Sequence, residues 1–169
     1  MSCELLGKLG VRRFKQPSVQ ARYALFDLDV KLQRYLDYTH GFFVEIGAND
    51  GLKQSNTRYL ESYLGWRGLL IEAVPELAER AKENRPLATV VHCACVSSDY
   101  TQDTITLYKA DLMSTIKGGM KTAIEEAEHL ERSVALQSVV DSIIEIDVPA
   151  RMLSTVLDDI QAPQIDFLS

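Results

Sequence analysis

The sequence predicts an α/β protein with a mostly parallel sheet and helices on both faces. Three apolar runs, at 42–46, 68–72 and 88–95, alternate with stretches whose apolar residues recur at helical spacing. This alternation is typical of βαβ units, which build parallel sheets. The runs are apolar nearly throughout, which indicates strands that are buried on both faces. A chain of 169 residues is most simply one domain.

Capping residues and prolines at the ends of the periodic stretches mark where the predicted helices begin and end. Ser55, Asn56 and Thr57 offer N-cap side chains before one helix, and Gly65 suits its C-terminus. Pro75 begins the next helix, and Pro86 ends it. We expect helices over 18–38, around 59–64, and over 76–84, 120–137 and 153–160, and further strands over 104–109, 143–148 and 165–168. Residues 1–40 are expected to pack as a helical segment on one domain formed by 41–169.

Composition and charge exclude several classes of function. The net charge is −6 and the isoelectric point about 5.1, so nucleic-acid binding is not expected. No apolar run approaches the ~20 residues of a membrane helix. The basic N-terminus has no continuous apolar stretch and includes Glu4, which predicts a cytoplasmic protein. Three cysteines without framework spacing predict no disulfide scaffold, and Cys93 and Cys95 lack the second ligand pair of a metal site.

The stretch FFVEIGANDGLKQSNT, residues 42–57, points to a ligand site. Its apolar strand becomes acidic at Glu45 and is followed by a loop from Gly47 to Gly51. Ligands of parallel sheets lie beyond the carboxyl ends of the strands, and glycine lets a backbone approach them closely. Glu72 ends the next strand roughly 20 residues beyond Gly51, where an acid accepts hydrogen bonds from ribose hydroxyls. A plain tight turn is the alternative, but the pair of features favours a nucleoside-containing cofactor.

The chemistry of the loop favours a methyl donor over a redox dinucleotide. A dinucleotide site has the pattern G-x-G-x-x-G, whereas Asn49 stands at the place of the second glycine here. Glu45 and Asp50 bring negative charge, which repels a diphosphate and attracts the sulfonium and ammonium groups of S-adenosylmethionine. The sequence contains no P-loop motif.

Four linked motifs resemble a known family. The segments GFFVEIGANDG, SNTRYLE, GWRGLLIEAVP and ENRP follow one another in this order. They resemble the FkbM-type methyltransferase family, strongly from Gly41 to Arg85 and more weakly to the end. The resemblance implies a class I methyltransferase fold with a Rossmann-like sheet. It also implies transfer of a methyl group from S-adenosylmethionine to an oxygen of a small molecule or sugar.

The resemblance also implies roles for individual residues. Glu72 accepts the ribose hydroxyls, Ala73 beside it also belongs to the implied cofactor site, and Ala94 lies near the adenine. Ser55, Asn56 and Thr57 either cap a helix alone or also face the cofactor. Trp66 and Arg67 are structural. The implied first cofactor motif consists of Glu45, Gly47, Ala48, Asn49, Asp50 and Gly51.

The sequence departs from the family pattern near its end. Family members continue with an Asp-x-Glu-Gly segment and further strands, so we expect a fragment or a short form that lacks the last strands. No catalytic base is assigned: the histidines at 40, 92 and 129 are expected in a surface loop, a core and a solvated helix. Asp111 and Ser114 either line the acceptor side or form a plain loop. Two alternatives stay open, a non-catalytic binding module and a nicotinamide-dependent oxidoreductase, and the oligomeric state is not predicted.

Overall fold

The computed structural model describes residues 23–109, 114–119 and 144–169, together with 122, 125, 127–129 and 131. The beginning of the helix expected over 18–38, most of the helix expected over 120–137, and Asp111 lie outside the described residues. No helix in the described part combines the length and the apolarity that crossing a membrane requires.

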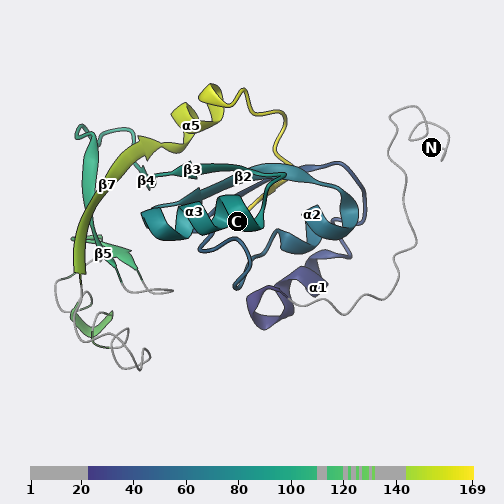
Figure 1. Ribbon diagram of the computed structural model, residues 1–169, viewed down its shortest axis with the longest axis horizontal. Helices are drawn as coiled ribbons and strands as arrows, with labels where there is room; N and C mark the ends of the chain where they lie inside the picture. Colours follow the sequence, from purple (N-terminus) through teal and green to yellow (C-terminus); the bar gives the residue numbers. More distant parts are fainter. Residues whose placement is uncertain are drawn as a thin grey trace.

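The first sheet is parallel and confirms the expected βαβ order. Its strands lie in the order β3-β2-β1-β8, so the chain builds outward from β1 to one side and later adds β8 on the other (Figure 1). All three pairings are parallel, with Phe43 opposite Gly68 on β2 and opposite Phe167 on β8. The strands are β1 (Phe42–Ile46), β2 (Arg67–Glu72), β3 (Thr89–His92) and β8 (Phe167–Leu168).

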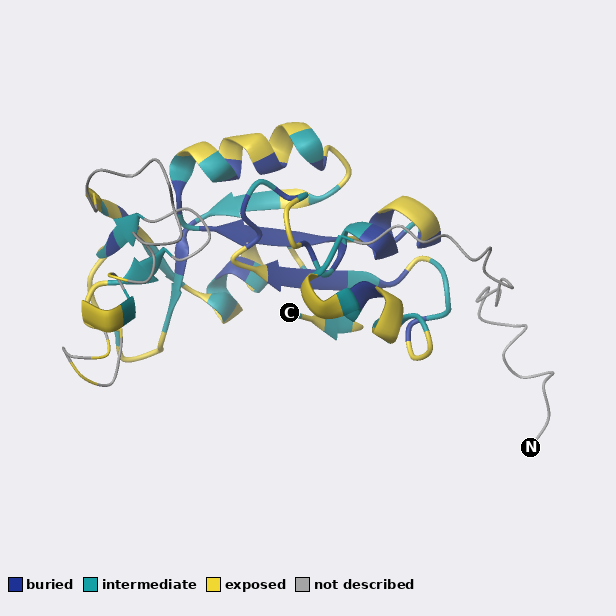
Figure 2. Ribbon diagram, turned by 90° about the horizontal axis from the view of Figure 1, so that it is seen from below, coloured by how far each residue is buried: buried dark blue, intermediate teal, exposed yellow. Residues whose placement is uncertain are grey.

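Helices cover both faces of this sheet, as the sequence predicts. Helices α2 (Arg58–Leu64) and α3 (Pro75–Asn84) lie on one side, and α5 (Leu153–Asp159) lies on the other (Figure 1). Alternate strand residues face opposite sides. Phe43 therefore packs in a cluster with residues of α2 and α3, whereas Val44 packs with Val156 of α5. Figure 2 shows the strands between these helices as the buried centre of the molecule.

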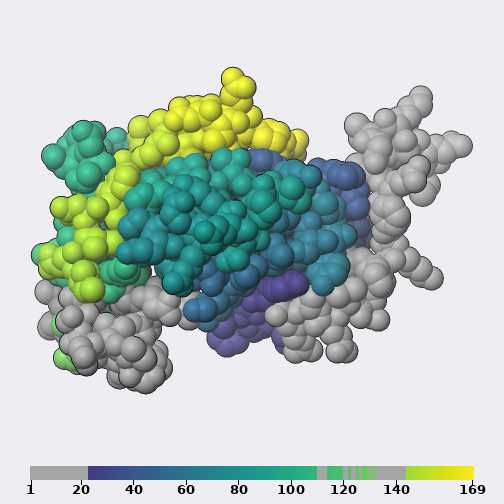
Figure 3. Space-filling view, in the orientation of Figure 1, coloured from purple at the N-terminus to yellow at the C-terminus, as the bar shows by residue number. Residues whose placement is uncertain are grey.

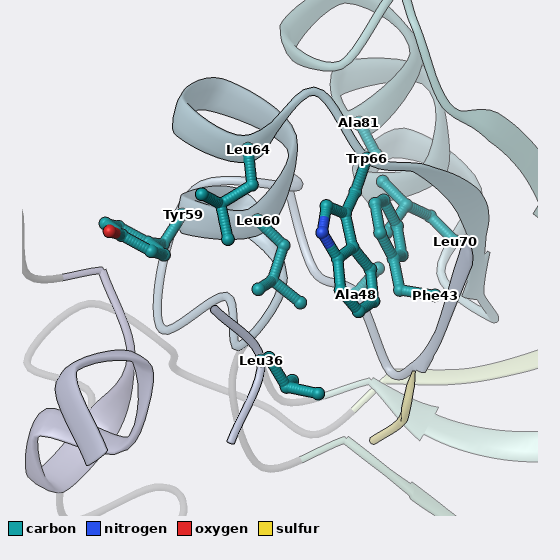
Figure 4. Close-up of a cluster of buried hydrophobic side chains, with 9 residues drawn as sticks. All are labelled: Leu36, Phe43, Ala48, Tyr59, Leu60, Leu64, Trp66, Leu70 and Ala81. Atoms are coloured by element: carbon teal, nitrogen blue, oxygen red, sulfur yellow. The ribbon is translucent and has the colours of Figure 1, made fainter. Parts of the chain in front are cut away.

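Trp66 is the largest fully buried side chain of the core and holds the start of β2 against β1. Its ring lies beside Phe43 and Ala48 (Figure 4). Its indole Nε1 donates a hydrogen bond of 2.8 Å to the Tyr38 carbonyl. A Cβ at Gly41 would lie 2.6 Å from the Trp66 ring, so only glycine fits there. The predicted structural role of Trp66 is confirmed.

A second sheet corrects the expectation of a single, mostly parallel one. Its strand order is β4-β7-β5-β6, with β4 parallel to β7 and the other two pairings antiparallel. The single strand expected over 88–95 is wrong, because the chain leaves the first sheet after His92 and pairs Ala94 with Ala150 in the second. The strands are β4 (Ala94–Val96), β5 (Thr104–Lys109), β6 (Thr115–Ile116) and β7 (Ile144–Met152).

The helix expected over 18–38 is much shorter in the described residues. A 3-10 turn, η2 (Leu25–Asp27), precedes the five-residue helix α1 (Leu28–Leu32). Phe26 and Asp27 have φ values of 54° and 57°, and left-handed backbone cannot continue an α-helix. Helical spacing of leucines did not reveal this break.

The pKa of Tyr38 provides a test of how β8 closes the fold. Burial, the negative charge of Asp166 and a hydrogen bond to its carboxylate raise the pKa of Tyr38 from 10.0 to about 12. The unfolded chain therefore loses this proton at a lower pH than the folded chain. The stability that the raised pKa of Tyr38 contributes is fully present below pH 10 and is lost as the pH rises towards 12.

We expect Tyr38→Phe to weaken the fall of stability between pH 10 and 12. Urea denaturation at a series of pH values measures this effect. In a chain that keeps Tyr38, the substitution Asp166→Asn should lower the pKa of Tyr38. An ultraviolet titration of tyrosinate measures this pKa. An unchanged alkaline fall in Tyr38→Phe would contradict the assignment.

Candidate functional site

A cavity of about 680 Å³ lies at the carboxyl ends of the parallel strands. Ile46 at the end of β1, Gly47 after it, Glu72 at the end of β2, and Ser169 after β8 all line it. The strand order reverses between β2 and β8, on either side of β1. Open α/β sheets bind ligands at this kind of switch point. The volume lies within the ~300–1,000 Å³ of small-molecule sites.

The glycine loop after β1, which borders the cavity at Gly47 and Asn49, contains three left-handed residues. Gly47, Asn49 and Gly51 have φ values of 76°, 51° and 77°. A Cβ at Gly47 would meet no atom within 4 Å, whereas one at Gly51 would lie 2.8 Å from the Arg85 side chain. Gly47 therefore borders open space, and Gly51 allows close packing against Arg85.

Every backbone N–H of this loop is already used inside the protein. The N–H groups of Gly47 and Ala48 both donate to the Ile71 carbonyl, at 2.8 and 3.1 Å. Asn49 N–H donates to Glu72, Asp50 N–H to the Asn49 side chain, and Gly51 N–H to the Ala48 carbonyl. Phosphate-binding loops present free N–H groups to the ligand. This loop presents none.

Glu72 is held in a fixed position on the cavity wall. One carboxylate oxygen accepts the N–H of Asn49 at 2.7 Å, and the other accepts the N–H of Val74 at 2.8 Å. An ionised carboxylate has about four acceptor positions. Each oxygen of Glu72 therefore retains capacity for another donor, and the side chain is buried at the cavity.

Glu45 also borders the cavity, but its carboxylate organises the start of α2. It accepts hydrogen bonds from the hydroxyls of Ser55 and Thr57 and from the N–H of Asn56, at 2.6–2.9 Å. Ser55 in turn accepts the N–H of Arg58, the first residue of α2, at 3.1 Å. Ser55 is thus the residue whose side chain caps this helix.

Arg85, directly after the last residue of α3, joins the same network, and sequence reasoning missed it. Its fully buried guanidinium donates to the Gly51 carbonyl at 3.0 Å and to the hydroxyls of Ser55 and Thr57 at 3.2 Å. Its Nε lies 2.9 Å from Glu61 in an ion pair. Burial lowers the pKa of Arg85, and the charge and hydrogen bond of Glu61 oppose this shift. An arginine before a proline at a helix end carries no signal of such burial.

The predicted cofactor residues separate into a wall and its support. The structure brings seven of them together on the cavity wall: Glu45, Gly47, Asn49, Asn56, Glu72, Ala73 and Ala94. The other five, Ala48, Asp50, Gly51, Ser55 and Thr57, lie behind it. Ala48 is in the core, and Asp50 accepts the N–H groups of Leu52 and Lys53 through its own carboxylate. Hydrogen bonds and packing inside the protein account for these five residues.

The far wall is built where the chain passes from β3 to β4. His92 Nε2 lies 3.0 Å from the Ala73 carbonyl, and Cys93, Ala94 and Cys95 line the cavity. A hydrogen bond to Cys95, together with burial, raises the pKa of Cys93. The same bond lowers the pKa of Cys95 to about 7. Within the described part of the chain, no three potential ligands among His, Cys, Asp and Glu form a metal site.

Several lining residues were not predicted. Leu25, Phe26 and Leu28 reach the cavity because Ala24 pairs with Gln54 in a parallel bridge. This long-range contact leaves no local signal. Ser114 lines the cavity, which was one of its two predicted positions. None of the three histidines is on the described wall, and His40 is exposed as expected.

Comparison with known proteins identifies one family. A family model described as the methyltransferase FkbM domain matches residues 45–169. The matched region begins in β1 at Glu45 and includes the glycine loop, Glu72, both sheets and β8. No curated protein matches the chain.

Proposed function

The chain belongs to the FkbM methyltransferase family, and from this membership we propose that it transfers a methyl group from S-adenosylmethionine. The proposed acceptor is a hydroxyl group of a small molecule or sugar. The strand order of the first sheet supports a Rossmann-like, class I arrangement. If its four parallel strands are numbered as they follow one another in the chain, they lie across the sheet in the order 3-2-1-4. The proposed domain is 41–169, and the described part of the preceding segment, residues 23–40, packs on it.

The observation that carries the proposal is the fixed position of the Glu72 carboxylate on the cavity wall. Two backbone N–H groups orient its carboxylate, and each oxygen has a further acceptor position at the cavity. A ribose carries two neighbouring hydroxyls, and each could donate a hydrogen bond to one of these positions. Ala73 and Ala94 are small, so the wall beside Glu72 leaves space for a flat base.

The loop chemistry supports a cofactor without phosphate groups. All five N–H groups from Gly47 to Gly51 have partners inside the protein. Charged side chains on the described wall are Glu45, Glu72 and Lys53. Two carboxylates and no free N–H groups favour a sulfonium compound over a diphosphate. This weakens the oxidoreductase alternative.

When bound, S-adenosylmethionine supplies an electrophilic methyl group. The residues of the chain bind and orient: Glu72 holds the ribose, and the Gly47 backbone leaves the space beside it open. Glu45 and Arg85 hold the loop and the start of α2 in place. Such positioning is a large part of catalysis when two bound reactants must meet in line.

Calorimetric titration of S-adenosylmethionine into the wild type and Glu72→Gln tests the proposal. Glutamine keeps the shape but removes the charge and one carboxylate oxygen. We expect affinity to fall about tenfold or more, because hydrogen bonds to charged groups contribute about 1.5–3 kcal/mol. Glu79→Gln is the matched control, since Glu79 is exposed on α3 and pairs with Lys82. Its affinity should match the wild type.

Two further measurements make the outcome decisive. Circular dichroism shows whether Glu72→Gln is folded, because the substitution also weakens the bonds to Asn49 and Val74. NADH is titrated in parallel. Binding of NADH without binding of S-adenosylmethionine would refute the proposal, and so would equal affinities of the folded Glu72→Gln variant and the wild type.

A further inference from the structure

Exposed apolar side chains gather on one side of the cavity. Phe26 is 85% exposed, Leu25 is 49% exposed, and both line the cavity together with Leu28. We call these three residues the apolar lip. Ile46, at the end of β1, is 41% exposed and lines the same cavity. Single exposed apolar residues are ordinary, but a group of them at one cavity indicates an apolar ligand.

The backbone of the lip is held in an unfavourable conformation. Phe26 and Asp27 are consecutive left-handed residues, and Gln54, which bridges to Ala24, has a φ of 56°. Left-handed backbone is rare for a bulky residue such as phenylalanine. Such conformations persist where surrounding contacts impose them, and they cluster at binding sites.

Contacts on both sides of the lip impose this conformation. The bridge to Gln54 fixes the residue before it. After it, the buried Asp29 carboxylate accepts the N–H groups of Tyr23 and Val30, at 2.7 and 3.0 Å. The segment that carries the lip is purple in Figure 3 and lies at the surface of the molecule. The fold thus uses specific polar contacts to hold apolar side chains at the cavity.

The lip and the Glu72 wall differ in chemistry. Glu72 and Asn49 present polar groups, while the lip side chains present hydrocarbon alone. Hydrocarbon offers no hydrogen bond to a ribose, an amino-acid group or the hydroxyl-rich face of a sugar. Burial of an alkyl or aryl group against it is favourable in proportion to the area removed from water.

We propose that the apolar lip binds the body of the methyl acceptor, and that the acceptor is a hydroxyl compound carrying an alkyl or aryl group. This inference rests on the proposed function and narrows it from any hydroxyl compound to an amphipathic one. Phe26 is the principal contact, because it is the most exposed of the lip residues.

Alkyl glucosides of increasing length test the lip without knowledge of the natural acceptor. Methyl, butyl and octyl glucoside share one sugar and are titrated below micelle formation, with and without S-adenosylmethionine. Affinity for the wild type should rise with chain length by up to about fourfold per buried methylene, which corresponds to ~0.8 kcal/mol. Phe26→Ser should flatten this rise, and Phe26→Leu should retain most of it.

Tyr35→Ser is the matched control. Tyr35 is an aromatic residue that is 70% exposed and lies away from the cavity wall, so its loss should leave the chain-length dependence unchanged. Equal affinity of the wild type for methyl and octyl glucoside would overturn the inference. An undiminished rise in Phe26→Ser would do the same.

Donor binding separates this inference from the proposed function. Phe26→Ser should bind S-adenosylmethionine as the wild type does, because the lip is distinct from Glu72. A wild type that binds octyl glucoside through Phe26 but does not bind S-adenosylmethionine would refute the methyltransferase proposal. The lip would then be an apolar ligand site without an acceptor role, which overturns the inference as stated.

Discussion

Arg85→Met is expected to destabilise the folded chain by about 3–5 kcal/mol, the usual effect of removing one partner of a buried ion pair. The substitution leaves Glu61 with a buried charge, and among the described residues Arg58, 3.4 Å away, is the remaining ion-pair partner. It also removes the donors to the Gly51 carbonyl and to the Thr57 hydroxyl. Urea denaturation followed by circular dichroism measures the loss.

Two further variants distinguish buried charge from general damage. Arg85→Met with Glu61→Gln should recover part of the stability, because Glu61 then no longer carries a buried charge that has lost its partner. Lys82→Ala removes a cation from α3, the helix that Arg85 follows, but the pair of Lys82 with Glu79 is exposed, so a change within about 0.5 kcal/mol is expected. Equal stabilities of Arg85→Met and Lys82→Ala would contradict the role of the network.

Trp66→Ala is expected to cost about 3–5 kcal/mol, as large truncations of buried aromatic residues do. Trp66 has no exposed surface and packs against Phe43 and Ala48 (Figure 4). Its loss would leave a cavity beside Gly41 and remove the hydrogen bond to the Tyr38 carbonyl. Since this is the single tryptophan of the chain, circular dichroism must follow the unfolding.

A graded series separates packing from hydrogen bonding at this position. Trp66→Phe keeps most of the apolar contact and should lose less stability than Trp66→Ala. Tyr35→Ala, at an exposed aromatic residue, should stay within about 0.5 kcal/mol of the wild type. A loss below about 1 kcal/mol for Trp66→Ala would show that the core repacks around the gap.

Elements with local signals were predicted closely. β1 and α3 agree with expectation to within one residue, because an apolar run before Gly47 and a helix between Pro75 and Pro86 carry their own boundaries. The transition at Cys93 was not predicted, since its cause is the pairing of Ala94 with Ala150. Burial alone cannot tell whether an apolar segment continues one sheet or enters another.

The residues of the candidate site also divide into those that local motifs predicted and those that contacts far along the chain place there. Gly47, Asn49, Glu72 and Ala94 were expected near a cofactor and do line one cavity. Their spacing reflects strand ends, which the sequence marks with glycine and acid. Arg85 and Phe26 were missed because their positions depend on residues far along the chain, Gly51 to Thr57 for one and Gln54 for the other.

The sequence by itself determined the α/β class, the parallel strands around β1 and the family of the chain, because each depends on short motifs in order. The tertiary structure decided which acids remain open to a ligand. Glu45 and Glu72 are buried acids near the ends of neighbouring strands, yet Glu45 binds the start of α2 while Glu72 keeps acceptor positions at the cavity. The physical reason is that a carboxylate is occupied by whichever donors the fold brings within reach, and those donors come from other elements.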